Sequence, residues 1–186
     1  MRLAVLALAV ALCGCLGQRP ESPAADAVAP VSHTFHFEAA SLTATLPADY
    51  LGFAPTDAGP DGTGTYLFTV PESSRIVTAF VWAGIPDAER EAWDAPDTVM
   101  EHHRDQHTEW VEPSDLGLGG SAAMFYRAHP AEHPEGVAAG QQWEGLTVRG
   151  CSADRCYALT AMEMGKAPMA DAEHYAALLR GIRVTD

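Results

Sequence analysis

The chain has 186 residues, and its Asp and Glu residues outnumber Lys and Arg by 25 to 11, which gives a formal net charge of −14 at pH 7. A chain this acidic repels nucleic-acid phosphates and anionic lipid headgroups, so we expect no nucleic acid among its partners. Solubility is one interpretation of the charge, and a basic partner protein or a cation is the other.

The first residues have the parts of an export signal. Arg2 is followed by an unbroken apolar stretch from Leu3 to Leu12, which ends at small residues. A single positive charge, a short apolar core and small residues at the end are typical of a signal peptide. The apolar stretch has about ten residues, whereas a membrane-spanning helix needs about twenty. We therefore expect residues 1–14 to be cleaved off.

The motif Leu12-Cys13-Gly14-Cys15 resembles the lipobox of bacterial lipoproteins, with Leu three residues before the modified Cys and a small residue directly before it. Cys15 fits this pattern, whereas Cys13 would place Leu12 where a small residue is required. The resemblance implies that Cys15 carries fatty acids such as palmitate and anchors the chain in the lipid bilayer. Leu16 is not the Asp that resembles an inner-membrane retention signal, which implies the outer membrane of a bacterial cell envelope, facing the periplasm. The alternative is an ordinary secretory signal cut elsewhere.

A tether and one domain follow the signal. Residues 15–32 are rich in Ala, Pro, Ser and Gly and have no hydrophobic period, which is typical of a flexible linker. Its root-mean-square reach is roughly 20 to 25 Å. Residues 33–186 are long enough for a single domain that buries a core without help from metals or many disulfides.

Two hairpins are predicted at the start of this domain. From His33 to Leu46 apolar residues alternate with polar ones on either side of a short break, which predicts two paired strands. Pro47 to Tyr50 then breaks the pattern, and Gly, Pro and Asp residues predict a surface loop over residues 57–64. The β-branched and aromatic runs that predict the second hairpin are Tyr66 to Val70 and Ile76 to Trp82.

An amphipathic helix is predicted between Pro86 and Trp110, where helix formers and charged residues replace the β-branched ones. Asp94 or Ala95, placed before Pro96, is a plausible helix start. One stripe at helical spacing would face a sheet. Its residues are Val99, His103, His107 and Trp110.

The remaining elements are three strands, a helix and a last short strand at Ile182 and Val184. The helix, from about Ala170 to Arg180, would turn Tyr175, Leu178 and Leu179 inward. The strands are predicted at Ala122 to Ala128, Gln142 to Val148 and Tyr157 to Glu163, with a long loop over residues 129–140. This element order predicts an α+β fold, in which two helices pack on an antiparallel sheet.

Two cysteines lie inside the domain, Cys151 and Cys156, and in an oxidising envelope they should pair. Four turn-like residues separate them, and strand-forming residues flank them on both sides. We therefore expect a structural disulfide that joins the two strands of a hairpin. A redox or metal role is the alternative, but four intervening residues are not the two of a thioredoxin-like motif.

The stretch Leu46-Pro-Ala-Asp-Tyr50, together with a Tyr157-Ala-Leu-Thr160 strand that precedes a helix, resembles the PsbP-like fold family. The likeness covers most of residues 33–184. It implies a PsbP-like sandwich and a role as an accessory or binding protein. No catalytic residue and no binding motif of that family can be matched to a position in this chain.

Eight histidines suggest a metal site, with His103 and His107 as the candidate ligands. On a helix they would stand four residues apart and reach one Zn²⁺ or Cu²⁺ ion. A third ligand would come from His129, His133 or a carboxylate. The intervening Arg104, Asp105 and Gln106 do not complete a metalloprotease His-Glu-x-x-His motif. The alternative is that the pair packs half-buried and His102 is solvated. We expect no metal and no cofactor.

Catalytic motifs are not found. Gly119 to Ala123 lacks the Gly-x-Ser-x-Gly order of a nucleophile turn and predicts a turn entering a strand. Residues 59–64 have no Lys to meet a phosphate. Neighbouring carboxylates such as Glu89 and Glu91, or Glu132 and Glu135, lie in polar surroundings that predict solvated surface charge. The four tryptophans predict packing rather than a ligand-stacking set, and they are Trp82, Trp93, Trp110 and Trp143.

The sequence thus predicts a membrane-anchored envelope lipoprotein that is not an enzyme and that binds another envelope protein or serves as an accessory subunit. A periplasmic metal-binding protein that uses the His cluster is the alternative. A hydrolase would need a pocket with convergent polar groups, and a domain that only fills structural space would have neither a pocket nor an apolar patch.

Overall fold

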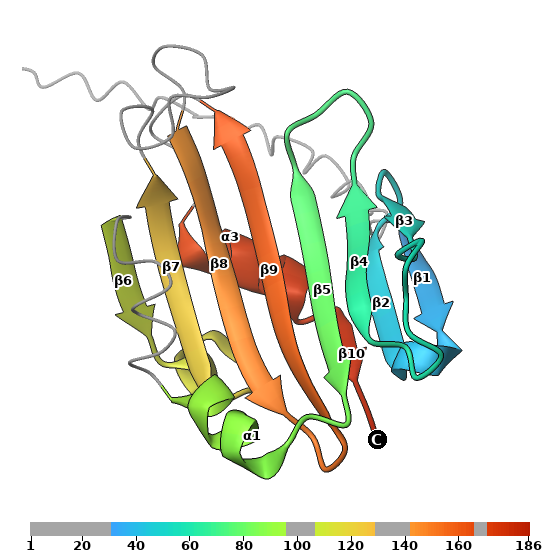
Figure 1. Ribbon diagram of the computed structural model, residues 1–186. Helices are drawn as coiled ribbons and strands as arrows, with labels where there is room; N and C mark the ends of the chain where they lie inside the picture. The colour runs from blue at the N-terminus through green and yellow to red at the C-terminus, as the bar shows by residue number, and fades with distance from the viewer. Residues whose placement is uncertain (1–30, 96–106, 129–141, 166–170) are drawn as a thin grey trace, which may run out of the picture.

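The computed structural model describes residues 31–95, 107–128, 142–165 and 171–186 (Figure 1). The predicted signal peptide, Cys15 and most of the tether lie outside these ranges, as do four of the histidines discussed above. These histidines are His102, His103, His129 and His133. Within the described residues, no helix is long and apolar enough to cross a membrane.

A seven-stranded antiparallel sheet is the largest element of the domain, with strand order β3-β4-β5-β9-β8-β7-β6. Its longest strands, β8 and β9, form a hairpin at its centre. The strands are β3 (Leu51–Phe53), β4 (Gly64–Thr69), β5 (Ile76–Ala83), β6 (His107–Val111), β7 (Ala122–Ala128), β8 (Gln142–Cys151) and β9 (Arg155–Gly165). Apolar residues at alternate positions of these strands point to one face, because successive side chains of a strand project to opposite sides.

A second, three-stranded antiparallel sheet lies beside the first and has β2 at its centre. Its strands are β1 (Ser32–Phe37), β2 (Leu42–Pro47) and β10 (Ile182–Val184). A short 3-10 turn, η1 (Glu38–Ala40), joins β1 to β2. Leu42, Ala44 and Leu46 alternate along β2 and are buried. The predicted first hairpin is confirmed, and Ser32, which the prediction left in the tether, belongs to its first strand.

The core lies between one face of the large sheet and a layer made of the small sheet and helix α3 (Ala172–Leu179), which Figure 1 shows behind the strands. Rings from β1 pack on rings from β4 across this space, with Phe35 5.4 Å from Phe68 and Phe37 4.7 Å from Tyr66 between ring centroids. Tyr175 and Leu179 of α3 are buried, as predicted, and Leu178 is half-buried. The predicted α+β class is confirmed.

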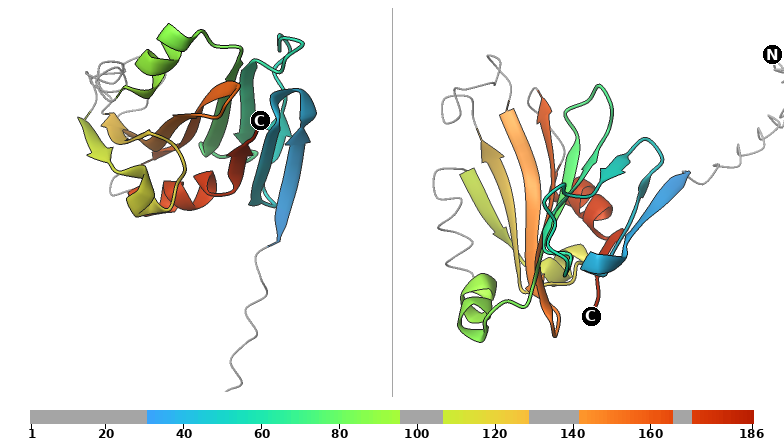
Figure 2. Two further views of the ribbon diagram at one scale, coloured as in Figure 1. Left: turned by 90° about the horizontal axis from the view of Figure 1, so that it is seen from below. Right: turned by 45° about the vertical axis from the view of Figure 1, so that its right-hand side comes forward.

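Helix α1 (Asp87–Asp94) packs on the opposite face of the large sheet, as Figure 1 and the left view of Figure 2, seen from below, show. It holds this face through Trp93, whose ring centroid lies 5.7 Å from that of Phe80 and 6.0 Å from that of Trp82. Packing is therefore confirmed as a role of Trp82 and Trp93. In the part of the chain that the structure describes, the large sheet carries α1 on one face, and α3 and the small sheet lie on the other.

The helix predicted between Pro86 and Trp110 is wrong at its end, whereas the start predicted at Asp94 or Ala95 borders residues outside the described ranges. Helix α1 ends at Asp94, and Ala95 is extended with φ −70° and ψ 124°. The helix start before Pro96 therefore stays a prediction, because residues 96–106 lie outside the described ranges. Residues from His107 onward form strand β6, which pairs antiparallel with β7. Pairing with a neighbouring strand therefore prevailed over the helical spacing of His107 and Trp110.

Candidate functional site

A cleft of about 320 Å³ opens at the end of the domain where α3 and β10 meet the loop before β7. This region lies toward the bottom of the molecule in Figure 1. The lining combines backbone from a glycine-containing loop with side chains of the central hairpin, α3 and β10. The lining residues are Gly117, Leu118, Gly119, Val148, Tyr157, Leu159, Leu179, Arg180, Ile182, Arg183, Val184 and Thr185.

The cleft reaches side chains of the hydrophobic core. Val148, Leu159, Leu179 and Ile182 line it, and all four belong to the core that α3 and the small sheet cover. Polar and apolar groups share the exposed lining about equally, so polar groups can fix the orientation of an apolar group that enters the cleft. The cleft is therefore suited to one apolar side chain or a fragment of similar size.

Glycines shape the loop that forms one side of the cleft. The 3-10 turn η2 (Pro113–Leu116) ends at Gly117, which has φ 61°, a conformation that favours glycine. Gly120 has φ 115°, and a Cβ there would lie 2.5 Å from the carbonyl oxygen of Arg149. The backbone N–H of Ser121 donates to the same carbonyl at 2.9 Å. The predicted turn that enters β7 is thus confirmed.

Two arginines line the rim. The Arg180 guanidinium pairs with Glu173 and donates to the carbonyl of Leu116 at 3.4 Å. Arg183 is exposed and makes no ion pair with another residue of the described ranges. In a chain with net charge −14, this rim offers one cation, Arg183, that no carboxylate of the described ranges pairs with. A carboxylate next to an apolar group is the chemistry that the cleft fits.

The cleft does not assemble the groups of a hydrolytic site. Among the described residues that line it, none has an imidazole, thiol or carboxylate side chain. Across the described ranges, no group of three or more His, Cys, Asp or Glu residues is placed to hold a metal ion. His107 lies in β6, so the helical spacing that motivated its pairing with His103 does not apply to it, and His103 lies outside the described residues.

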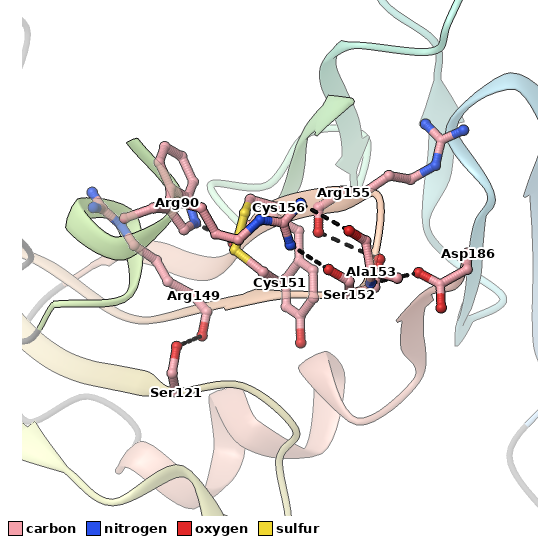
Figure 3. The surroundings of a disulfide bond; sticks show 11 residues. Arg90, Ser121, Arg149, Cys151, Ser152, Ala153, Arg155, Cys156 and Asp186 are labelled. Carbon is pink, nitrogen blue, oxygen red and sulfur yellow. Dashed lines mark hydrogen bonds between the residues drawn. A yellow bond between two sulfur atoms is a disulfide. The ribbon is translucent and has the colours of Figure 1, made fainter. Parts of the chain in front are cut away.

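The predicted disulfide is present and joins neighbouring strands. Cys151 ends β8 and pairs with Cys156 of β9, with their Cα atoms 4.0 Å apart. Figure 3 shows the turn beyond the bridge, which other parts of the chain hold in place. Arg90 of α1 donates to the carbonyls of Ser152 at 2.5 Å and Ala153 at 2.9 Å. This arrangement gives the bridge a structural role, as expected.

Two further contacts fix the same turn. The backbone N–H of Ala153 donates to the Asp186 carboxylate at 2.8 Å, and that of Gly84 donates to the carbonyl of Asp154 at 3.2 Å. Hydrogen bonds from Ser152 and from backbone N–H groups lower the pKa of the Asp186 carboxyl. The turn is thereby joined to α1, to the end of β5 and to the end of the chain.

Trp93 connects α1 to the hairpin. The Arg149 guanidinium carbon lies 4.8 Å from the centroid of its ring, and its Nε1 donates to the carbonyl of Tyr157 at 3.1 Å. Burial lowers the pKa of the Arg149 guanidinium, which stays a cation at neutral pH and can interact with the ring face. Trp110 differs, since it lies on edge strand β6 and is 37% exposed.

A second pocket, of about 520 Å³, lies at the edge of the large sheet beside β3. Its lining residues are Phe53, Ala54, Pro55, Thr56, Asp57, Thr63, Gly64, Thr65, Leu67 and Phe80. Phe53 is 49% exposed and Leu51, two residues before it on the same side of β3, is 48% exposed. This sheet edge therefore presents apolar side chains to the surroundings.

Two buried tyrosines of the core, Tyr50 and Tyr175, lie near the Glu163 carboxylate. Tyr50 and Tyr175 are each 1% exposed, and the Tyr50 hydroxyl has no hydrogen-bond partner among the described residues. Burial raises the pKa of both, and the carboxylates of Glu163 and Glu144 raise that of Tyr175 further. The sequence predicted that Tyr175 points inward, but no local pattern indicated that carboxylates would lie near it.

No protein-family model and no curated protein matches the sequence. Several solved structures are similar to it in fold, including the following three. A protein from Bacteroides thetaiotaomicron VPI-5482 has a TM-score of 0.51 at 10% identity, with 82% of this chain and 48% of that chain covered. The Saccharomyces cerevisiae Ran-binding protein Mog1p has a TM-score of 0.46 at 10% identity, with 83% and 96% covered. Cyanobacterial PsbP from Synechocystis sp. PCC 6803 has a TM-score of 0.39 at 12% identity, with 89% and 99% covered.

These similarities concern the fold alone. This chain spans about half the length of the Bacteroides protein. PsbP, the family named from the sequence, is among the similar structures, as is Mog1p. Both superpositions have TM-scores below 0.5 and carry no argument about the role of this chain.

Proposed function

We propose that this protein is exported, anchored in the membrane of a bacterial envelope through acyl groups on Cys15, and used there as a non-enzymatic module that binds another envelope protein. The motif Leu12-Cys13-Gly14-Cys15 and the tether-like composition of residues 15–32 support the anchor. The single observation that carries the binding role is the cleft, with its mixed apolar and polar lining and its arginine rim.

The cleft lies far from the tether, which favours its contact with a partner protein. The carbonyl of Val31, next to the tether, accepts from the backbone N–H of Ala48 at 3.0 Å, at one end of β2. At the other end of β2, Leu42 is the register partner of Val184, which lines the cleft. Six residues of strand separate these ends by about 17 Å. A protein held at its N-terminus would thus direct the cleft away from the anchor.

The anchor is tested by the mass of the N-terminal peptide of protein purified from its own membranes. We expect an acyl-modified peptide that begins at Cys15, and loss of membrane retention in Cys15→Ala. Cys13→Ala is the matched control and should keep both the modification and the retention. An unmodified N-terminus produced by cleavage at another position would contradict the anchor.

The binding role is tested by cross-linking the full-length protein in its envelope and comparing two variants with equal added bulk. A Cβ at Gly119 would have the Tyr157 hydroxyl 3.9 Å away and a backbone that accepts a side chain, so Gly119→Phe should fill the cleft. Ser114→Phe adds the same ring on exposed η2, outside the cleft.

We expect a cross-linked partner with the unchanged protein and with Ser114→Phe, and its loss with Gly119→Phe. The reason is that a ring at residue 119 would take the volume that a partner's apolar side chain needs. If the same partner is captured from both variants, the cleft is not its binding site and the proposal loses the observation that carries it.

A further inference from the structure

Exposed apolar side chains gather where the tether meets the domain. Four large apolar residues of the described ranges are strongly exposed, and three of them lie at this end: Val31 at 67%, Leu51 at 48% and Phe53 at 49%. We call Val31, Leu51 and Phe53 the apolar edge. The fourth, Trp110, lies on β6 at the opposite edge of the large sheet. Grouped apolar exposure of this kind marks an interaction surface rather than ordinary surface composition.

Backbone geometry brings the apolar edge together. The hydrogen bond from Ala48 to the Val31 carbonyl places Val31 beside the turn that leads into β3. Gly52 lies against Phe35 of β1, since a Cβ at residue 52 would come within 2.7 Å of the Phe35 ring. Leu51 and Phe53 therefore project from the other side of β3. Figures 1 and 2 show β1 and β3 as neighbours at this side of the domain.

We propose that the apolar edge rests on the bilayer to which Cys15 is anchored. This inference rests on the anchor proposed above and identifies a second contact with the same membrane. The stretch between Cys15 and Val31 has a reach of roughly 20 to 25 Å when flexible, which keeps the domain close to the lipid surface. At the high effective concentration that such a short tether sets, even a weak apolar contact is populated.

The negative charge of the protein favours zwitterionic over anionic lipid headgroups. The chain carries a net charge of −14, and Asp49 and Glu72 are exposed at this end of the domain. Arg75 does not supply a free cation, because it pairs with Asp49 at 2.7 Å. Anionic headgroups would therefore be repelled, and the apolar edge fits a surface of zwitterionic lipid.

The test uses the chain that begins at Cys15, coupled through the Cys15 thiol to a maleimide lipid in phosphatidylcholine vesicles. The vesicles also contain phosphatidylcholine with a photoreactive acyl chain, and lipid adducts are located by mass spectrometry. Chemical coupling replaces acylation by the cell, so this result does not depend on whether the anchor proposal holds. The N-terminal mass measurement tests the anchor separately.

Adducts are expected on the peptides that contain Val31, Leu51 and Phe53, and not on the peptide that contains Trp110. Phe53→Ser should lower the adduct yield at Leu51 by about tenfold, because it removes one of three apolar contacts. Leu51→Ser provides a second reduction at the same edge, and Trp110→Ser is the matched control that leaves the yield unchanged.

Two further outcomes decide the inference. Replacing part of the phosphatidylcholine with anionic phosphatidylglycerol should lower the adduct yield at the apolar edge. Adducts that are spread evenly over the surface, that concentrate at Trp110, or that increase with anionic lipid would overturn the proposal. If native envelopes instead yield a protein cross-linked to Leu51, the apolar edge is a protein interface and the bilayer contact is wrong.

Discussion

The two ends of the β-sheets differ in their surface residues: hydrogen bonds fix the turn at one end, and apolar side chains are exposed at the other. At the end with the disulfide, Arg90, Asp186 and Gly84 all bond to the turn beyond Cys151. At the end where the tether joins, Leu51 and Phe53 are about half exposed. The first end concentrates contacts that stabilise the fold, whereas the second leaves apolar area uncovered. The contacts that fix the turn and the exposed apolar side chains thus lie at opposite ends of the strands.

Trp93→Ala is expected to have the largest effect on this comparison. The substitution removes the contacts with Phe80, Trp82 and Arg149 and the hydrogen bond to Tyr157. We expect the free energy of unfolding to fall by about 3 kcal/mol, measured by urea denaturation. Trp110→Ala, on the exposed edge strand, should cost less than about 1 kcal/mol. Equal losses would show that the aromatic cluster is not what holds α1.

Replacing the disulfide should have the next largest effect. Cys151→Ser combined with Cys156→Ser opens the short loop closed by the bridge. The expected loss is about 2 kcal/mol in the free energy of unfolding, because the unfolded chain gains conformational entropy. A reducing agent should lower the stability of the unchanged protein by a similar amount and leave the double variant unaffected. If reduction destabilises both equally, the effect does not come from this bridge.

Arg90→Gln should have a moderate effect. It removes a guanidinium that bonds two carbonyls of the turn, and we expect the free energy of unfolding to fall by about 1 kcal/mol. Arg183→Gln removes the same charge from an exposed residue and should change stability by less than about 0.5 kcal/mol. Both variants remove one positive charge, so the difference between them measures the effect of the Arg90 hydrogen bonds on stability. Identical denaturation curves for both variants would count against the role of Arg90.

Phe53→Ser is expected to have the smallest effect on stability. The side chain is 49% exposed on an edge strand of three residues, so its removal should lower the free energy of unfolding by less than about 1 kcal/mol. The same variant should lose its contact with vesicles. If urea denaturation instead shows a loss as large as that of Trp93→Ala, Phe53 is a core residue and the two ends are not different in kind.

Local patterns predicted most of the fold. The strand over Ala122–Ala128 has the predicted bounds, because its aromatic residues favour a strand and a glycine turn precedes it. The pairing of Cys151 with Cys156 was equally accessible, since both lie in one hairpin. The sequence missed β3, which is only three residues long, and it extended a helix over His107 and Trp110, which belong to strand β6.

The candidate sites were not predictable in the same way. The cleft joins Gly119, Tyr157 and Ile182, which come from distant parts of the chain and share no spacing. The apolar edge joins Val31 to Leu51 through a strand register that no local period encodes. Conversely, the His103 and His107 pair was easily noticed because its spacing is local, but β6 shows that His107 is not on a helix.

The most direct test of a membrane-facing end and a partner-facing end places a photo-cross-linking residue at either Leu51 or Thr185 of the anchored protein in living cells. Thr185 is exposed and lines the cleft, whereas Leu51 belongs to the apolar edge. The account predicts a discrete protein adduct from Thr185 and lipid adducts from Leu51. A discrete protein adduct from Leu51, with none from Thr185, would contradict it.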